Sequence, residues 1–74
     1  MTRVVRNNKT GAYVNVDPFL NESFEYEDIT KATIFDDSVD EMTDADLLEY
    51  AKNGYGDTDV DLEVVPVKVS VEIV

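Results

Sequence analysis

The sequence contains no Cys and no His among its 74 residues, and it has few Gly, Pro, Lys and Arg residues. Without Cys, the chain cannot form disulfides, thiolate nucleophiles or iron–sulfur sites; without His, it lacks the usual zinc ligand and the usual general base. A chain of this length forms one small domain, residues 1–74, whose core is too modest to enclose a large substrate cleft. We therefore expect a protein that is not an enzyme and that uses no cofactor or metal.

Long apolar runs are also absent. The longest are doublets such as Val4-Val5 and Leu47-Leu48, far short of a membrane span or the apolar part of a signal peptide. An anionic membrane surface would repel so acidic a chain. We therefore expect a cytoplasmic location. The hydrophobic fraction of 43% distinguishes the sequence from disordered acidic tails and predicts a folded domain.

Acidic side chains are in excess: 17 Asp and Glu residues stand against 6 Lys and Arg residues, so the net charge is −11. Residues 1–16 carry +3, residues 17–63 carry −14, and residues 64–74 are neutral. A small domain needs a net charge of only roughly 2 to 8 in magnitude for solubility. Arg3, Arg6 and Lys9 are expected to be counter-charges, two of them on the solvent side of a first strand. The overall field argues against direct binding of nucleic acid.

The N-terminal half reads as β-structure. Residues 2–8 and 12–16 are β-prone runs separated by Lys9-Thr10-Gly11. Gly11 can adopt the positive φ that a short hairpin loop requires. Asp17-Pro18 should end the second strand because Pro cannot donate to a ladder. Residues 24–27 and 32–35 are weaker strand candidates.

One helix is predicted over residues 44–53. Thr43 is a suitable N-cap, Asp46 occupies the capping-box position, Met42 and Leu47 are placed as a hydrophobic staple, and Gly54 is the expected stop. The apolar stripe of the helix consists of Leu47, Leu48 and Ala51. The residues expected to pack beneath it are Val5, Val14, Phe35, Val67 and Val69.

The C-terminal run is a long strand with a change of phase. Its apolar residues occupy even positions as far as Val64 and odd positions from Val65 onward. Because a strand alternates faces with a period of two, the change would turn the apolar side chains to solvent unless one residue is absorbed. A bulge at residues 64–66 would do so, and Pro66 suits a bulge or an edge strand. The alternative is two strands joined by a kink.

These elements together predict the α+β class. We expect a small antiparallel β-sheet of three to five strands with one α-helix packed on one face. The sheet would combine the N-terminal hairpin, one or two middle strands and the C-terminal strand.

Metal binding is the first function to test against the acidic residues. Asp57, Asp59 and Asp61 have the one-three-five spacing of a calcium loop, but the sixth position is Leu62 and the twelfth is Lys68, where that loop uses Gly and Glu. Close carboxylate pairs could also hold magnesium or perform acid–base catalysis, yet they are unavoidable in so acidic a chain, and catalysis needs a pocket that shifts a pKa. A metal-dependent enzyme is therefore the least favoured interpretation, and none of these residues is assigned as a catalytic or metal-binding residue.

The acidic residues are more informative as a surface. Alternate residues of an extended strand repeat at about 6.6 Å, so residues 57–63 would present a row of charges on one face. Nucleic-acid backbones also present regular negative charges, which proteins bind through clefts rich in Lys and Arg. Tyr55, between Gly54 and Gly56, is expected in an exposed loop where it could add an aromatic contact. The candidate partner-binding residues are Asp36, Asp37, Asp40, Glu41, Asp44, Asp46, Glu49, Tyr55, Asp57, Asp59, Asp61 and Glu63.

Two segments carry a resemblance to known proteins. Residues 4–14, VVRNNKTGAYV, followed by residues 32–36, ATIFD, resemble small uncharacterised acidic proteins encoded by phages of Gram-positive bacteria. The resemblance implies a phage setting, in which small acidic proteins, including some anti-CRISPR and anti-restriction proteins, inhibit host enzymes that act on nucleic acids. It assigns no functional residues to this chain.

Two hypotheses follow. The first is a non-catalytic phage-type inhibitor whose acidic, DNA-mimicking surface blocks the nucleic-acid-binding cleft of a host protein, such as a defence nuclease. The alternative is a small phage accessory or structural interaction module whose acidity is mainly solvating. Its specificity would come from Tyr and Phe at a sheet edge or from self-association.

Overall fold

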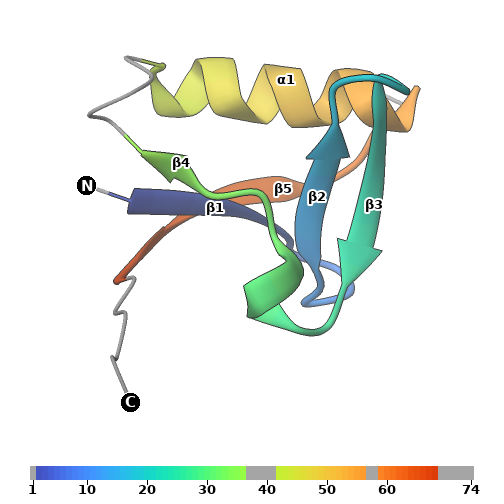
Figure 1. Ribbon diagram of the computed structural model, residues 1–74. Helices are drawn as coiled ribbons and strands as arrows, with labels where there is room; N and C mark the ends of the chain where they lie inside the picture. The colour runs from blue at the N-terminus through green and yellow to red at the C-terminus, as the bar shows by residue number, and fades with distance from the viewer. Residues whose placement is uncertain (1, 37–41, 57–58, 69–74) are drawn as a thin grey trace.

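The computed structural model describes residues 2–36, 42–56 and 59–68, which form an α+β fold with one sheet and one α-helix (Figure 1). The strands are β1 (Thr2–Asn7), β2 (Tyr13–Asp17), β3 (Glu22–Tyr26), β4 (Phe35–Asp36) and β5 (Leu62–Val67). A short 3₁₀ helix, η1 (Ile29–Lys31), precedes β4, and the α-helix is α1 (Asp44–Tyr55). The predicted fold class is confirmed.

Strand β1 is the centre of the sheet. It pairs with β5 along one edge, and its other edge is shared between β2 and β4, with β3 continuing outward from β2. All these pairings are antiparallel. Of the β-prone run at residues 32–35, only Phe35 is in a strand; Thr33 instead lies along β2, where its N–H donates to the Val14 carbonyl at 3.1 Å.

The predicted N-terminal hairpin is present, and its turn is built on Asn7. The Asn7 Oδ1 accepts hydrogen bonds from the backbone N–H groups of Lys9 at 2.9 Å and Thr10 at 3.4 Å. Gly11 follows with a φ of 74°, the left-handed conformation that Gly adopts without a steric penalty. An Asx turn and a positive-φ residue therefore close this hairpin.

Helix α1 begins as its sequence predicts. The Thr43 hydroxyl accepts from the Asp46 N–H at 3.2 Å, and the Asp46 carboxylate accepts from the Thr43 N–H at 3.3 Å, which completes a capping box. The predicted stop at Gly54 is wrong, because the helix continues through Gly54 to Tyr55. It ends at Gly56, which has a φ of 66° in the left-handed region.

Strand β5 contains no bulge, contrary to the prediction. It pairs with β1 in unbroken register from Leu62 opposite Asn7 to Val67 opposite Thr2. The change of apolar phase needs no correction because this part of the sheet is apolar on both faces: Val4 and Val5, which point to opposite faces, are 1% and 0% exposed. Val67 therefore lies on the face away from α1, not beneath the helix as expected; Val69 lies outside the described residues.

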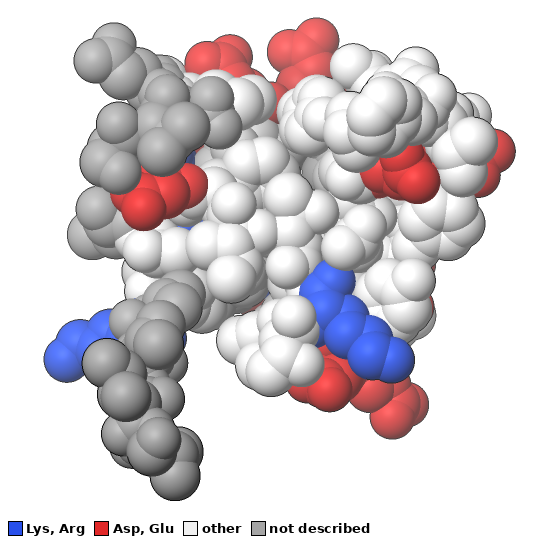
Figure 2. Space-filling model, viewed as in Figure 1, with Lys and Arg blue, Asp and Glu red and all other residues white. Residues whose placement is uncertain are grey.

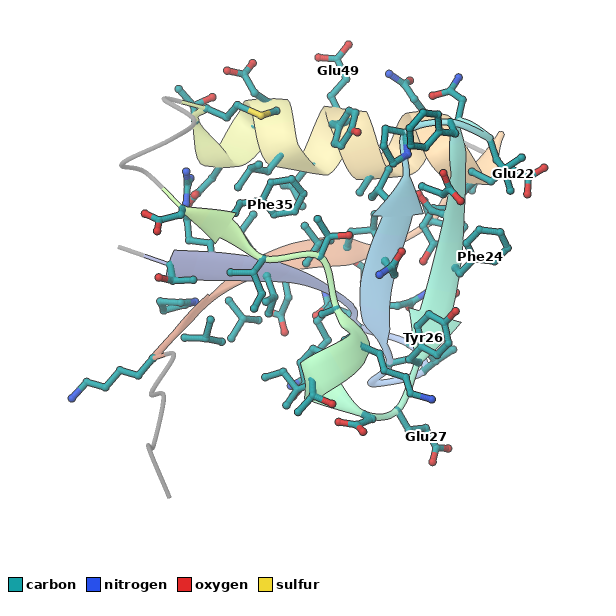
Figure 3. The ribbon with its side chains drawn as sticks, in the orientation of Figure 1. Glu22, Phe24, Tyr26, Glu27, Phe35 and Glu49 are labelled. Atoms are coloured by element: carbon teal, nitrogen blue, oxygen red, sulfur yellow. The ribbon has the colours of Figure 1, made fainter. Side chains whose placement is uncertain are left out.

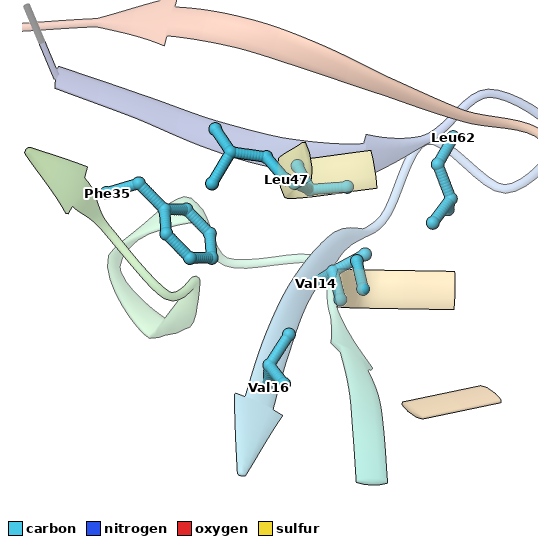
Figure 4. Packing of buried hydrophobic residues seen from close by; sticks show 7 residues of the cluster. Val14, Val16, Phe35, Leu47 and Leu62 are labelled. Carbon is cyan, nitrogen blue, oxygen red and sulfur yellow. The ribbon is translucent and has the colours of Figure 1, made fainter. Parts of the chain in front are cut away.

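The core lies between the sheet and α1 (Figure 4). Phe35 also meets the ring of Tyr50 edge to face, with centroids 6.2 Å apart and planes at 87°. Leu48, predicted as part of the same stripe, is only partly buried at the border of the core. The buried cluster comprises Val5, Val14, Val16, Phe35, Leu47, Ala51 and Leu62.

Candidate acidic interaction surface

None of the described acidic side chains is buried. All of them are exposed except Asp17 and Glu63, which are half-buried. In the view of Figure 2 the carboxylates lie in separate groups, with uncharged surface and Lys or Arg side chains between them. The acidic surface is therefore distributed over several elements and does not form one continuous patch on this face.

The first group of predicted residues lies at and near the start of α1. Asp44 and Asp46 occupy the first turn, where carboxylates suit the positive end of the helix dipole, and Glu49 is exposed one turn further on (Figure 3). Asp36 is exposed at the end of β4. Asp37, Asp40 and Glu41 lie outside the described residues.

The second group precedes and enters β5, where the alternate residues Val60, Leu62 and Val64 contact the core, as predicted. Strand β5 begins only at Leu62, so Asp59 and Asp61 lie in the irregular segment before it, although both are exposed. Glu63 is within β5 but is half-buried and forms an ion pair with Arg6, 3.5 Å from Nε to Oε1. Asp57 lies outside the described residues. Since α1 has 12 residues and rises about 1.5 Å per residue, the two groups flank a helix about 18 Å long.

The Arg side chains are turned toward the protein. Arg3 is 7% exposed, and its guanidinium bonds the Asp44 carboxylate and the Met42 carbonyl, each at 2.7 Å. The expectation that two of the three N-terminal cations lie on the solvent side of the first strand is therefore wrong, because β1 directs Arg3 beneath the start of α1 and ends before Lys9. Arg6 is half-exposed and paired with Glu63, so both Arg side chains have carboxylate partners and the exposed charge is predominantly negative.

The glycines on either side of Tyr55 predict an exposed loop, and this prediction is wrong. Tyr55 is the last residue of α1 and half-buried, and its hydroxyl is buried without a hydrogen-bond partner of good geometry among the described residues. Burial, together with the nearby Glu25 carboxylate, raises the pKa of Tyr55 to about 12. Its polar tip is therefore a poor candidate for a partner contact.

Replacing Tyr55 with Phe should reduce the loss of stability at high pH. Tyr55 ionises near 10 when unfolded and near 12 when folded, so its contribution to stability is complete below pH 10 and is lost as the pH rises toward 12. Urea denaturation across this range should show a smaller decline for Tyr55→Phe than for the natural protein. Equal declines would contradict the assignment, and ultraviolet difference titration of both proteins would locate the missing phenol.

A third group of exposed acids was missed by sequence reasoning. Glu22 and Glu25 lie on β3, and Glu27 and Asp28 follow it. The density of acids in residues 22–28 is the sequence signal that indicates this group. Two of these residues have structural partners. Glu25 accepts from the Thr10 hydroxyl at 2.8 Å, and hydrogen bonds from Thr30 lower the pKa of Asp28, which caps η1.

The described residues contain no group of three or more Asp or Glu residues that could hold a metal ion. Within the same residues, no helix is long and apolar enough to cross a membrane.

A shallow hollow lies between β2, β3 and η1, where the Lys31 ammonium sits 5.4 Å from the centre of the Tyr26 ring. It is lined by Asn15, Tyr26, Thr30, Lys31 and Ala32.

Comparisons with known protein families, with curated proteins and with solved structures find no match to this chain. Its function must therefore be argued from its own residues.

Proposed function

We propose that this protein is a non-catalytic, phage-type inhibitor whose acidic surface occupies the basic nucleic-acid-binding cleft of a host protein, such as a defence nuclease. The observation that carries the proposal is the separation of charge in the fold. Ten of the 12 described Asp and Glu residues are exposed, whereas Arg3 is buried, Arg6 is paired with Glu63, and only Lys9, Lys31 and Lys68 are exposed cations among the described residues. A partner rich in Lys and Arg therefore meets a negative field with little competition from the protein's own Arg side chains.

A second function is favoured by a different observation. Phe24 and Tyr26 are both 38% exposed on β3, the outermost strand on that side of the sheet (Figure 3). Aromatic residues of this kind serve as anchors in protein interfaces. They fit an accessory interaction module in which the acidic residues only provide solubility.

Competition and salt distinguish the two functions. The purified chain would be immobilised, host proteins captured on it, and the capture repeated with excess duplex DNA and across a range of about 50 to about 200 mM salt. DNA mimicry predicts that DNA displaces the captured protein and that binding weakens steeply with salt, since exposed charges are screened within about 10 Å at 0.1 M. Capture that is insensitive to both would favour the accessory module.

Neutralising Asp59 and Asp61 should weaken binding to the captured protein about tenfold at low salt, which is about 1.4 kcal/mol. The variant Asp59→Asn/Asp61→Asn keeps an Oδ1 at position 61 to accept from Asn8, as Asp61 does at 3.0 Å. Titration calorimetry at two salt concentrations would measure the change.

The matched control is Glu27→Gln/Asp28→Asn, which removes the same charge from the far end of β3 while keeping an acceptor for Thr30. A smaller loss of affinity than in Asp59→Asn/Asp61→Asn would place the contact beside β5, and an equal loss would show that the third group of acids also contacts the partner. If both double variants bind like the natural protein, the acidity is only solvating and the proposal fails.

A further inference from the structure

The turn between β2 and β3 holds two large apolar side chains in solvent. Phe19 is 97% exposed and Leu20 is 60% exposed. We call Pro18, Phe19 and Leu20 the hairpin tip; it lies beside the C-terminal end of α1 (Figure 1). Isolated apolar residues are common on protein surfaces, but a Phe with almost no contact to its own fold contributes no packing energy to that fold.

Formation of the turn does not require these side chains, because the β1–β2 turn has the same design with polar residues. In both turns an Asx side chain accepts from the N–H groups two and three residues later, and a positive-φ residue comes fourth. By this equivalence Phe19 corresponds to Lys9 and Leu20 to Thr10. The fold thus builds the same turn without apolar residues, and Phe19 and Leu20 need another explanation.

The hairpin tip is held in one conformation. Asp17 Oδ1 accepts from the N–H groups of Phe19 at 2.9 Å and Leu20 at 3.3 Å, and Asn21 completes the turn with a φ of 53°. Pro18 restricts the backbone further. An apolar group presented on such a turn loses little conformational entropy on binding, which is the advantage of preorganised anchors.

Two carboxylates flank the hairpin tip. Asp17 and Glu22 are direct cross-strand partners. Two like charges in directly opposite positions destabilise the strand pair. No ion pair to either residue is present among the described residues. Cations from a binding partner would relieve this repulsion, whereas a second copy of the chain or an anionic membrane would increase it.

We propose that the hairpin tip is an anchor that inserts Phe19 and Leu20 into an apolar pocket rimmed by Lys and Arg on the partner protein. The proposal rests on the proposed function in one respect, that the partner is basic. It adds a contact whose energy comes from apolar burial and is therefore less sensitive to salt than the acidic surface.

Photo-cross-linking tests the anchor before the partner is known. The photoreactive residue p-benzoylphenylalanine would replace Phe19 in one variant and the equivalent Lys9 in a control, and each full chain would be irradiated in cells that produce it. The expected result is a product several-fold more abundant from position 19, mapped to an apolar pocket with Lys or Arg around it. Equal yields from the two positions, or products from position 19 only with a second copy or with lipid, would overturn the proposal.

Affinity measurements on the cross-linked partner separate the anchor from the acidic surface. Phe19→Ser/Leu20→Thr should bind about tenfold or more weakly at both low and high salt, with unchanged thermal unfolding because these side chains are exposed. Asp17→Asn/Glu22→Gln should weaken binding mainly at low salt; its Asn can still form the turn, as Asn7 does in the first hairpin.

The two proposals fail differently. Full affinity in Phe19→Ser/Leu20→Thr, combined with weakened binding in Asp59→Asn/Asp61→Asn, would reject the anchor and retain the acidic inhibitor. The opposite combination would retain the anchor and reject electrostatic mimicry.

Discussion

Replacing Gly54 with Ala should lower the free energy of unfolding by about 3 kcal/mol, although Ala is the better helix former by about 1 kcal/mol. Gly54 lies where α1 meets β3. A Cβ there would overlap the Ser23 Oγ and lie 2.7 Å from the Ser23 backbone nitrogen and 3.0 Å from the Glu22 carbonyl carbon. A side chain could rotate away, but the strand backbone is held by its pairing with β2. Urea denaturation followed by circular dichroism would measure the loss.

Two controls separate the backbone clash from other effects. Asn53→Ala, at the adjacent exposed helical position, should be neutral or slightly stabilising. Ser23→Ala removes the Oγ that donates to the Ala51 carbonyl at 2.8 Å and should cost about 1 kcal/mol. Combined with Gly54→Ala it should rescue only part of the loss, because the backbone nitrogen of Ser23 remains. Full rescue would show that the Oγ alone is the obstacle, and a stabilised Gly54→Ala would contradict the close approach itself.

The features that the sequence predicts correctly are those decided by neighbours along the chain. The capping box of Thr43 and Asp46 and the Gly11 turn each depend on residues within a few positions, so their local chemistry suffices. The position of Gly54 depends on a strand some thirty residues earlier in the chain. Read locally, it is a helix stop, whereas in the fold it is the contact point with Ser23 and the stop is Gly56.

The failures at β5 and Tyr55 have the same origin. The expected bulge assumed that one face of the strand meets solvent, but Val4 is buried on the face away from α1, so both phases of the apolar pattern are satisfied. The glycines that flank Tyr55 predict a loop, and the extension of α1 buries its hydroxyl instead.

Of the candidate surface, sequence reasoning found the acids near α1 and β5. It missed those near β3, since their exposure depends on which face α1 covers.

The side chains on the inner face of α1 become smaller toward its C-terminal end, from Leu47 through Ala51 to Gly54. The helical period of 3.6 places these residues on one face, and Leu47 and Ala51 are both 0% exposed. The decrease in side-chain size allows the helix to lie close to β3 at Gly54 while leaving room for a full Leu at its other end. Most of the apolar burial of α1 is therefore concentrated at Leu47.

Leu47→Ala should consequently lower the free energy of unfolding by about 3–5 kcal/mol, because it removes buried methyl groups and leaves a cavity that the sheet cannot close. A domain of this size has roughly 4–11 kcal/mol in total, so the loss is a large share of the stability, and at the lower end of that range the variant would be largely unfolded at 25 °C. Leu48→Ala is the matched control: it deletes the same atoms one residue later, at the partly buried border of the core, and should cost about 1–2 kcal/mol.

Should Leu47→Ala not fold at all, Leu47→Met provides a measurable second point, since a volume-conserving replacement should cost less than about 1.5 kcal/mol. Urea titrations of the three variants would then order them as Leu47→Met and Leu48→Ala near the natural protein and Leu47→Ala far below it. Equal losses for the two alanine variants would mean that α1 packs with both leucines equally. That outcome would contradict the orientation of the helix from which the close approach at Gly54 and the exposure of the α1 carboxylates follow.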